Sequence, residues 1–144
     1  MSGVPDSPDM GLGEQGAEVL RSVLHTLAAN RDSLPELGSP IRVFTDPPRG
    51  AEYPYVTLGA IRSEDREDSG GARASHAYSL HVWDRDNGGA SLLNLLSRIQ
   101  SALERDMPHT TLALFADIFP DRRGGEANPN MRHGLLRLRT LTEG

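Results

Sequence analysis

The chain of 144 residues contains no cysteine and no lysine. Without cysteine it can form neither disulfides nor the thiolate nucleophiles and thiolate metal sites of many enzymes. Without lysine it cannot form the usual phosphate-binding P-loop, and the uniform use of arginine fits the coding bias of a GC-rich genome better than a special function. No apolar run approaches the roughly 20 residues that span a bilayer, and the first 13 residues lack the features of a signal peptide. We therefore expect no membrane partner and a place of action inside a cell.

Negative charge is in modest excess, at −5. This balance argues against a general nucleic-acid binder, because affinity for a duplex depends largely on clustered basic side chains. With 37% apolar and 24% charged residues, the composition is that of an ordinary globular protein. The length suits one domain with one core.

The spacing of apolar residues divides the chain into an arm and a folded domain. Residues 1–13 are rich in Gly, Pro and Ser and are expected to form an N-terminal arm, which leaves 14–144 as a single domain. Within that domain, apolar residues recur at helical spacing over 14–31 and 90–105. Both segments are predicted to be amphipathic helices.

Strands fill most of the remaining sequence. They are expected at 41–44, 54–62, 74–84, 111–119 and 132–141, with hairpin loops at 63–73 and 120–130. The predicted fold class is α/β, more narrowly α+β. It is a two-layer sandwich in which both helices pack on one face of a mainly antiparallel, four- to five-stranded sheet, in the order αβββαββ.

Alternation along the strands gives the predicted sheet two unlike faces. One is continuously apolar and can pack against both helices. The other should be polar if it met water, yet several of its residues are large and apolar. Either the arm or the 120–130 loop covers it, or a partner subunit does, since Trp, Tyr, Phe and Arg are enriched in interfaces. The candidate interface residues are Tyr55, Ile61, His81, Trp83, Phe115, Phe119, Arg137 and Arg139.

Motifs that resemble catalytic or ligand-binding signatures have simpler local explanations. The stretch GLGEQG at 11–16 has dinucleotide-binding spacing but follows VPDSPDM, which is no strand. The five histidines lack the spacing of a zinc site and are expected at the surface or in an interface. Asp84 and Asp86 begin a turn, where such residues bond the local backbone. We therefore predict no enzyme activity, no cofactor and no metal ion.

Three stretches taken together carry a family resemblance. They are YPYVTLG, followed by a polar loop, then HAYSLHVWDRDNGG, and then the leucine-rich segment SLLNLLSRIQSALE. In this order they resemble the tail-completion or tail-terminator family of long-tailed phages and gene transfer agents. The resemblance covers about residues 14–141 and implies an α/β sandwich fold.

The resemblance also implies a function. Members form a ring of six subunits that caps the tail tube, ends its growth and joins it to the head connector. The expected partners are therefore other copies in a homo-hexamer, the tail tube protein and the head connector or stopper protein. DNA would pass through the channel without specific binding, in a virion or phage-like particle assembled in the bacterial cytoplasm. The candidate channel-lining loop residues are Glu64, Asp65, Arg66, Glu67 and Asp68.

Two other functions are compatible with the residues. A head-side connector, either an adaptor or a head-closure protein, would also be a ring protein and would differ in its level within the particle. A monomeric intracellular binding domain would be the outcome if the chain covers its own apolar face.

Overall fold

The computed structural model describes residues 11–66, 73–85, 90–121 and 128–143; for residues 73, 114–121 and 128–131 it describes the backbone alone. Helix α1 (Leu12–Ala29) begins two residues earlier than predicted, with Gly11 as its N-cap. Residues 1–10 of the expected arm lie outside the described residues. Helix α2 spans Ala90–Asp106. No helix in the described ranges is both long and apolar enough to cross a membrane.

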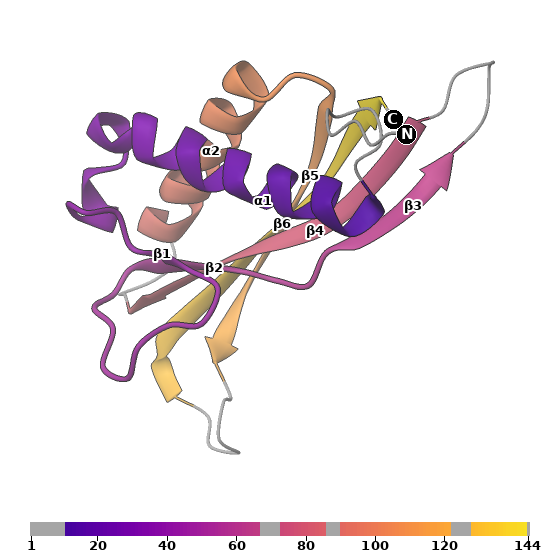
Figure 1. Cartoon of the computed structure of the whole chain (residues 1–144). Helices are drawn as coiled ribbons and strands as arrows, with labels where there is room; N and C mark the ends of the chain where they lie inside the picture. Colours follow the sequence, from indigo (N-terminus) through magenta and orange to yellow (C-terminus); the bar gives the residue numbers. More distant parts are fainter. Residues whose placement is uncertain (1–10, 67–72, 86–89, 122–127, 144) are drawn as a thin grey trace.

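The described residues contain six strands, which form one sheet (Figure 1). They are β1 (Val43–Phe44), β2 (Tyr55–Leu58), β3 (Arg62–Arg66), β4 (Arg73–Arg85), β5 (Thr110–Asp121) and β6 (Asn128–Glu143). The order across the sheet is β1-β2-β4-β6-β5, and β3 also pairs with β4. Strands β1 and β2 are parallel and the other pairs are antiparallel. The α+β class and the mainly antiparallel sheet are confirmed, with an additional strand because the expected loop at 63–73 contains β3.

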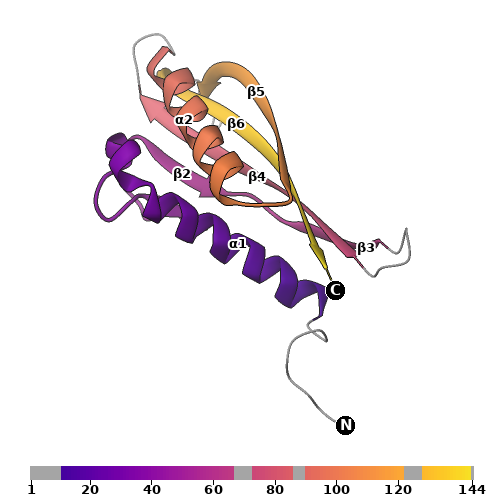
Figure 2. The same cartoon turned by 90° about the horizontal axis from the view of Figure 1, so that it is seen from above.

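Both helices cover the same face of the sheet, as the view from above in Figure 2 shows. The apolar stripe of each helix packs against the side chains of β2, β4 and β6 that point to this face. Burial of each such large apolar side chain stabilises the fold by about 1.5–3 kcal/mol. The largest fully buried apolar side chains are Val23, Leu27, Leu34, Leu37, Leu80, Leu92, Leu95, Leu96, Ile99, Leu103 and Leu136.

A one-residue irregularity separates β2 from β3. Leu58 pairs with Leu80 and Arg62 pairs with Ala77, so residues 59–61 stand opposite only residues 78–79 of β4. Because side chains alternate along a strand, one extra residue moves the following side chains to the other face. Ile61 accordingly packs against the core under the helices. The prediction that Ile61 faces away from the helices was wrong for this reason.

Gly16 of α1 lets the helix lie close to the sheet where β3 begins. A Cβ at this position would be 3.0 Å from Ser63 Oγ and 3.5 Å from Ile61 Cδ1. Glycine weakens a helix interior, so its presence here is explained by this close approach. In the stretch GLGEQG, the first glycine caps α1 and the last makes this contact.

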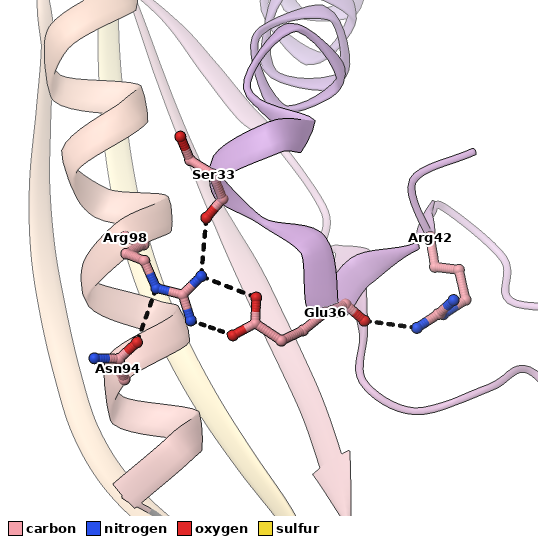
Figure 3. Close-up of polar contacts among 5 residues, drawn as sticks. All are labelled: Ser33, Glu36, Arg42, Asn94 and Arg98. Atoms are coloured by element: carbon pink, nitrogen blue, oxygen red, sulfur yellow. Dashed lines mark hydrogen bonds and ion pairs between the residues drawn. The ribbon is translucent and has the colours of Figure 1, made fainter. Parts of the chain in front are cut away.

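Arg98 of α2 holds the connection between α1 and β1 (Figure 3). Its guanidinium donates to both carboxylate oxygens of Glu36 and, at 2.8 Å, to the carbonyl of Ser33. Its Nε donates to Asn94 Oδ1 at 2.8 Å, and Arg42 donates to the Glu36 carbonyl at 2.8 Å. Hydrogen bonding from Arg98 lowers the pKa of Glu36. The planar fork of arginine thereby fixes the segment that follows α1 onto α2.

Gly134 of β6 makes room for α2. It pairs with Val82 on the helix-covered face, and a Cβ at this position would overlap the side chain of Leu96. Leu96 is fully buried, so it could move aside only by displacing the side chains packed around it. The helix can therefore lie at its observed distance from the sheet only if position 134 lacks a side chain.

We predict that Gly134→Ala lowers the free energy of unfolding by about 1–3 kcal/mol, the usual cost of overpacking a core. Denaturant unfolding of the purified chain measures this change. Gly13→Ala is the matched control, because nothing lies within 4 Å of the added Cβ. It should be neutral or stabilise the helix by up to about 1 kcal/mol. A Gly134→Ala protein as stable as the wild type would contradict the described packing of α2.

Candidate interaction surface

The face of the sheet turned away from both helices, called the open face below, carries a row of rings. Trp83 on β4 lies directly opposite Tyr55 on β2 and, on its other side, directly opposite His133 on β6. Tyr55 is only 4% exposed, and its ring contacts those of Phe44 and Tyr53, at centroid distances of 5.9 and 5.2 Å. The chain thus covers Tyr55 with Phe44 and Tyr53, which belong to neither the expected arm nor the 120–130 loop.

Trp83 is the centre of this row and remains half-buried. Its ring stacks on that of His133, with centroids 4.0 Å apart and planes 5° from parallel. Trp83 Nε1 donates to Thr57 Oγ1 at 2.9 Å, and His81 Nδ1 lies 2.7 Å from His133 Nε2. Burial lowers the pKa of His81, so its neutral form is favoured. The four side chains form a stacked, hydrogen-bonded cluster held rigidly on the surface of the sheet.

Arginines follow the rings along the same face. Arg137 has Ser79 and Ala113 as cross-strand neighbours, and both arginines, 137 and 139, are exposed. Small residues on β4 and β5 leave a hollow of about 420 Å³ that the two arginines border. Among the described side chains that line this hollow, those of β4 and β5 at Ala77, Ser79 and Ala113 are small, and both arginines reach the surface. The open face therefore joins a rigid aromatic half to a positively charged half.

The described part of the open face exposes few large apolar side chains. Among the residues whose side chains are described, Leu93 on α2, at 40%, is the one exposed large hydrophobic residue. The backbone register pairs Phe115 with Leu135 and Phe119 with His133, but the side chains of these phenylalanines lie outside the described part of the chain. Of the candidate interface residues, His81, Trp83, Arg137 and Arg139 are brought together on this face.

The expected acidic loop is in part a strand. Glu64, Asp65 and Arg66 belong to β3, and Arg62 forms an ion pair with Glu64 at 3.3 Å. The two acids of β3 are thus matched by two arginines in the same strand. Glu67 and Asp68 lie outside the described residues, so an acidic channel lining stays a prediction.

His76 is the polar residue that the sequence did not place correctly. It was expected at a surface or an interface, but it is fully buried under α1. Thr142 Oγ1 donates to Gln15 Oε1 at 2.8 Å, so the same hydroxyl accepts from His76 Nε2 at 3.0 Å. His76 Nδ1 is then the acceptor for the Ser63 hydroxyl at 2.7 Å.

This arrangement ties elements together and differs from a catalytic triad. A triad places a carboxylate on the second histidine nitrogen, whereas here a threonine hydroxyl occupies that position. The chain of hydrogen bonds joins α1, β3, β4 and β6. In the described ranges, no three His, Asp or Glu side chains converge as ligands of a metal ion would.

Comparisons with known proteins agree with this description. A family model described as tail completion protein gp17 matches residues 18–143. The comparison with curated proteins finds no match. Among solved structures, a chain from the virion of a native gene transfer agent particle is similar, with a TM-score of 0.57 and 21% identity. The match covers 86% of this chain and 93% of that one. At this identity the structural likeness supports the fold.

We predict that stability falls as the pH drops below about 6.5, the ordinary pKa of histidine in an unfolded chain. Burial lowers the pKa values of His76 and His81 in the folded state. The unfolded state therefore binds more protons in this range, and acid favours unfolding. His76→Gln keeps a donor and an acceptor but stays neutral, so it should flatten this decline. Denaturant titrations from about pH 8 to about pH 5 measure the slope; identical slopes in both proteins would contradict the role of His76.

Proposed function

We propose, because the chain belongs to the tail completion protein gp17 family, that six copies form a ring that caps the tail tube. Tail completion is a step in building the tail, so the chain is a structural protein of a virion or phage-like particle. In this proposal the ring ends tail growth and connects the tube to the head connector. DNA passes through its centre without being held.

The observation that carries this proposal is the open face. A half-buried tryptophan stacked on histidine, beside two exposed arginines, has the composition of an interface core. Such a rigid surface loses little side-chain freedom when a partner covers it. In a ring each subunit uses two different surfaces, and the open face supplies one of them. We propose that His81, Trp83, Arg137 and Arg139 lie in the contact between subunits.

The remaining partners follow from the position of the ring. Its two rims would contact different proteins, the tail tube protein on one side and the head connector or stopper protein on the other. These contacts need binding surfaces and no reaction chemistry, which suits a face built from stacked rings and arginines.

Removal of the gene tests the proposal. Cells that produce the particle without this chain should contain filled heads and separate tails, and the tails should exceed normal length. Electron microscopy of lysates measures both properties, and expression of the wild-type chain should restore joined particles. Joined particles with tails of normal length in the absence of the chain would refute the function.

We predict that Trp83→Ala reduces the fraction of particles with a ring more than its effect on folding explains. Loss of the half-buried ring should cost folding about 1–3 kcal/mol, whereas loss of an interface anchor costs association about 2 kcal/mol or more. Urea unfolding of the isolated chain and counts of rings by electron microscopy measure the two effects.

Tyr78→Phe is the control for this comparison. It removes a buried hydrogen bond to Thr140 at 2.8 Å on the helix-covered face and leaves the open face intact. It should lower stability by about 1 kcal/mol and keep the rings. If the two variants lost rings in the same proportion to their loss of stability, Trp83 would contribute to folding and not to the contact between subunits.

A further inference from the structure

The two histidines beside Trp83 are placed so that only one hydrogen fits between their rings. His81 Nδ1 lies 2.7 Å from His133 Nε2, and the planes of the two imidazoles differ by 14°. At this distance one nitrogen must carry a hydrogen and the other must accept it. The ring of His133 also stacks on that of Trp83, with centroids 4.0 Å apart. A change in the histidine pair therefore reaches the tryptophan directly.

The number of protons bound by the pair decides whether this contact can persist. When both rings are neutral, one N–H donates to the facing nitrogen of the other ring. After one proton is taken up, a charged imidazole donates to a neutral one, and such a charge-assisted hydrogen bond is the stronger kind. A second proton places an N–H on both facing nitrogens and a positive charge on both rings. Two donors repel each other at 2.7 Å, so the rings then separate.

We propose that His81 and His133 form a pH-sensitive switch in the contact between subunits. The pair accepts one proton with its geometry intact, whereas the second proton separates the rings, moves Trp83 out of its stack and weakens the contact with the next copy. The effect on assembly rests on the proposed function, but the titration of the pair does not depend on it. Burial of His81, which lowers its pKa, acts in the same direction because it disfavours the doubly charged state.

The described groups beside the pair on the open face are neutral or positively charged. Thr57 on β2 is opposite His81 and is neutral, and the nearby tyrosines stay neutral in the range where histidine titrates. The charged residues next along β4 and β6 are Arg85 and Arg137, which keep their charge throughout this range. They disfavour a second positive charge on the pair. On β5, the side chain of Asp117 lies outside the described part of the chain.

Trp83 fluorescence tests the switch, because the chain contains one tryptophan. In the isolated wild-type chain, titrated from about pH 8 to about pH 4, the fluorescence should change in two steps about one pH unit or more apart, since the two histidines are coupled. Circular dichroism of the same samples should show unchanged helix and sheet content across both steps. A single step, or a change that occurs only where the helices unfold, would overturn the inference.

His81→Gln removes one of the two titrating rings, while its amide can still bond to His133 in either protonation state. Trp83 fluorescence in this variant should change in one step. His25→Gln is the matched control, because His25 is exposed on α1, away from the open face, and the same substitution there leaves the pair intact. It should keep both steps. Two steps in His81→Gln would show that the pair is not their source and would also overturn the inference.

Particles test the consequence for assembly. In the pH range of the second step, wild-type particles should lose rings relative to their number at about pH 8, and His81→Gln particles should keep theirs. Electron microscopy after incubation at each pH counts the rings. Equal retention of rings by both proteins would overturn the role of the pair in assembly and leave the proposed function standing. Wild-type particles without rings at about pH 8 would refute the proposed function, whereas the fluorescence titration would still decide how the pair binds protons.

Discussion

A sheet buries both faces only when a layer packs on each, and here α1 and α2 lie on the same face. The other face must then be covered by its own side chains or by another molecule. In the aromatic half of this face the side chains cover one another, since Trp83 stacks on His133 and Tyr55 packs against Phe44. Its arginine half stays exposed. Because the helices pack on one face only, the other face is left as a surface for binding. The aromatic side chains of this surface are already fixed, so they lose little conformational entropy when a partner binds.

The extra residue between β2 and β3 explains why one end of the helix-covered face contains buried polar side chains. It turns Ile61 into the core and brings Ser63 under α1 beside His76. Gly16 admits this pair at the closest approach of helix and strand. The hydrogen bonds that continue to Thr142 and Gln15 then satisfy a histidine that would otherwise be costly to bury. Helix position, strand register and polar contacts at this end depend on one another.

Sequence patterns predicted the elements well because both helices and the long strands have strong apolar periodicity. They failed where tertiary contacts override local pattern. Residues 63–66 were predicted to be part of a loop, yet β4 is long enough to pair with them as a strand. Alternation placed Ile61 wrongly because an extra residue in a strand leaves no sign in composition. Alternation puts His76 on the same face of β4 as Tyr78 and Leu80, but its partners Ser63 and Thr142 are far away in the sequence, so the hydrogen bonds that allow its burial could not be predicted. The arginines and Trp83 were found because alternation holds without interruption along β4 and β6.

A cryo-electron microscopy map of the head–tail junction in intact particles tests the central claim most directly. The account predicts a closed ring of six copies at the end of the tail nearest the head, in which a neighbouring copy covers Trp83 and Arg137. A junction without this chain, or a ring in which the open face of every copy meets solvent, would contradict it.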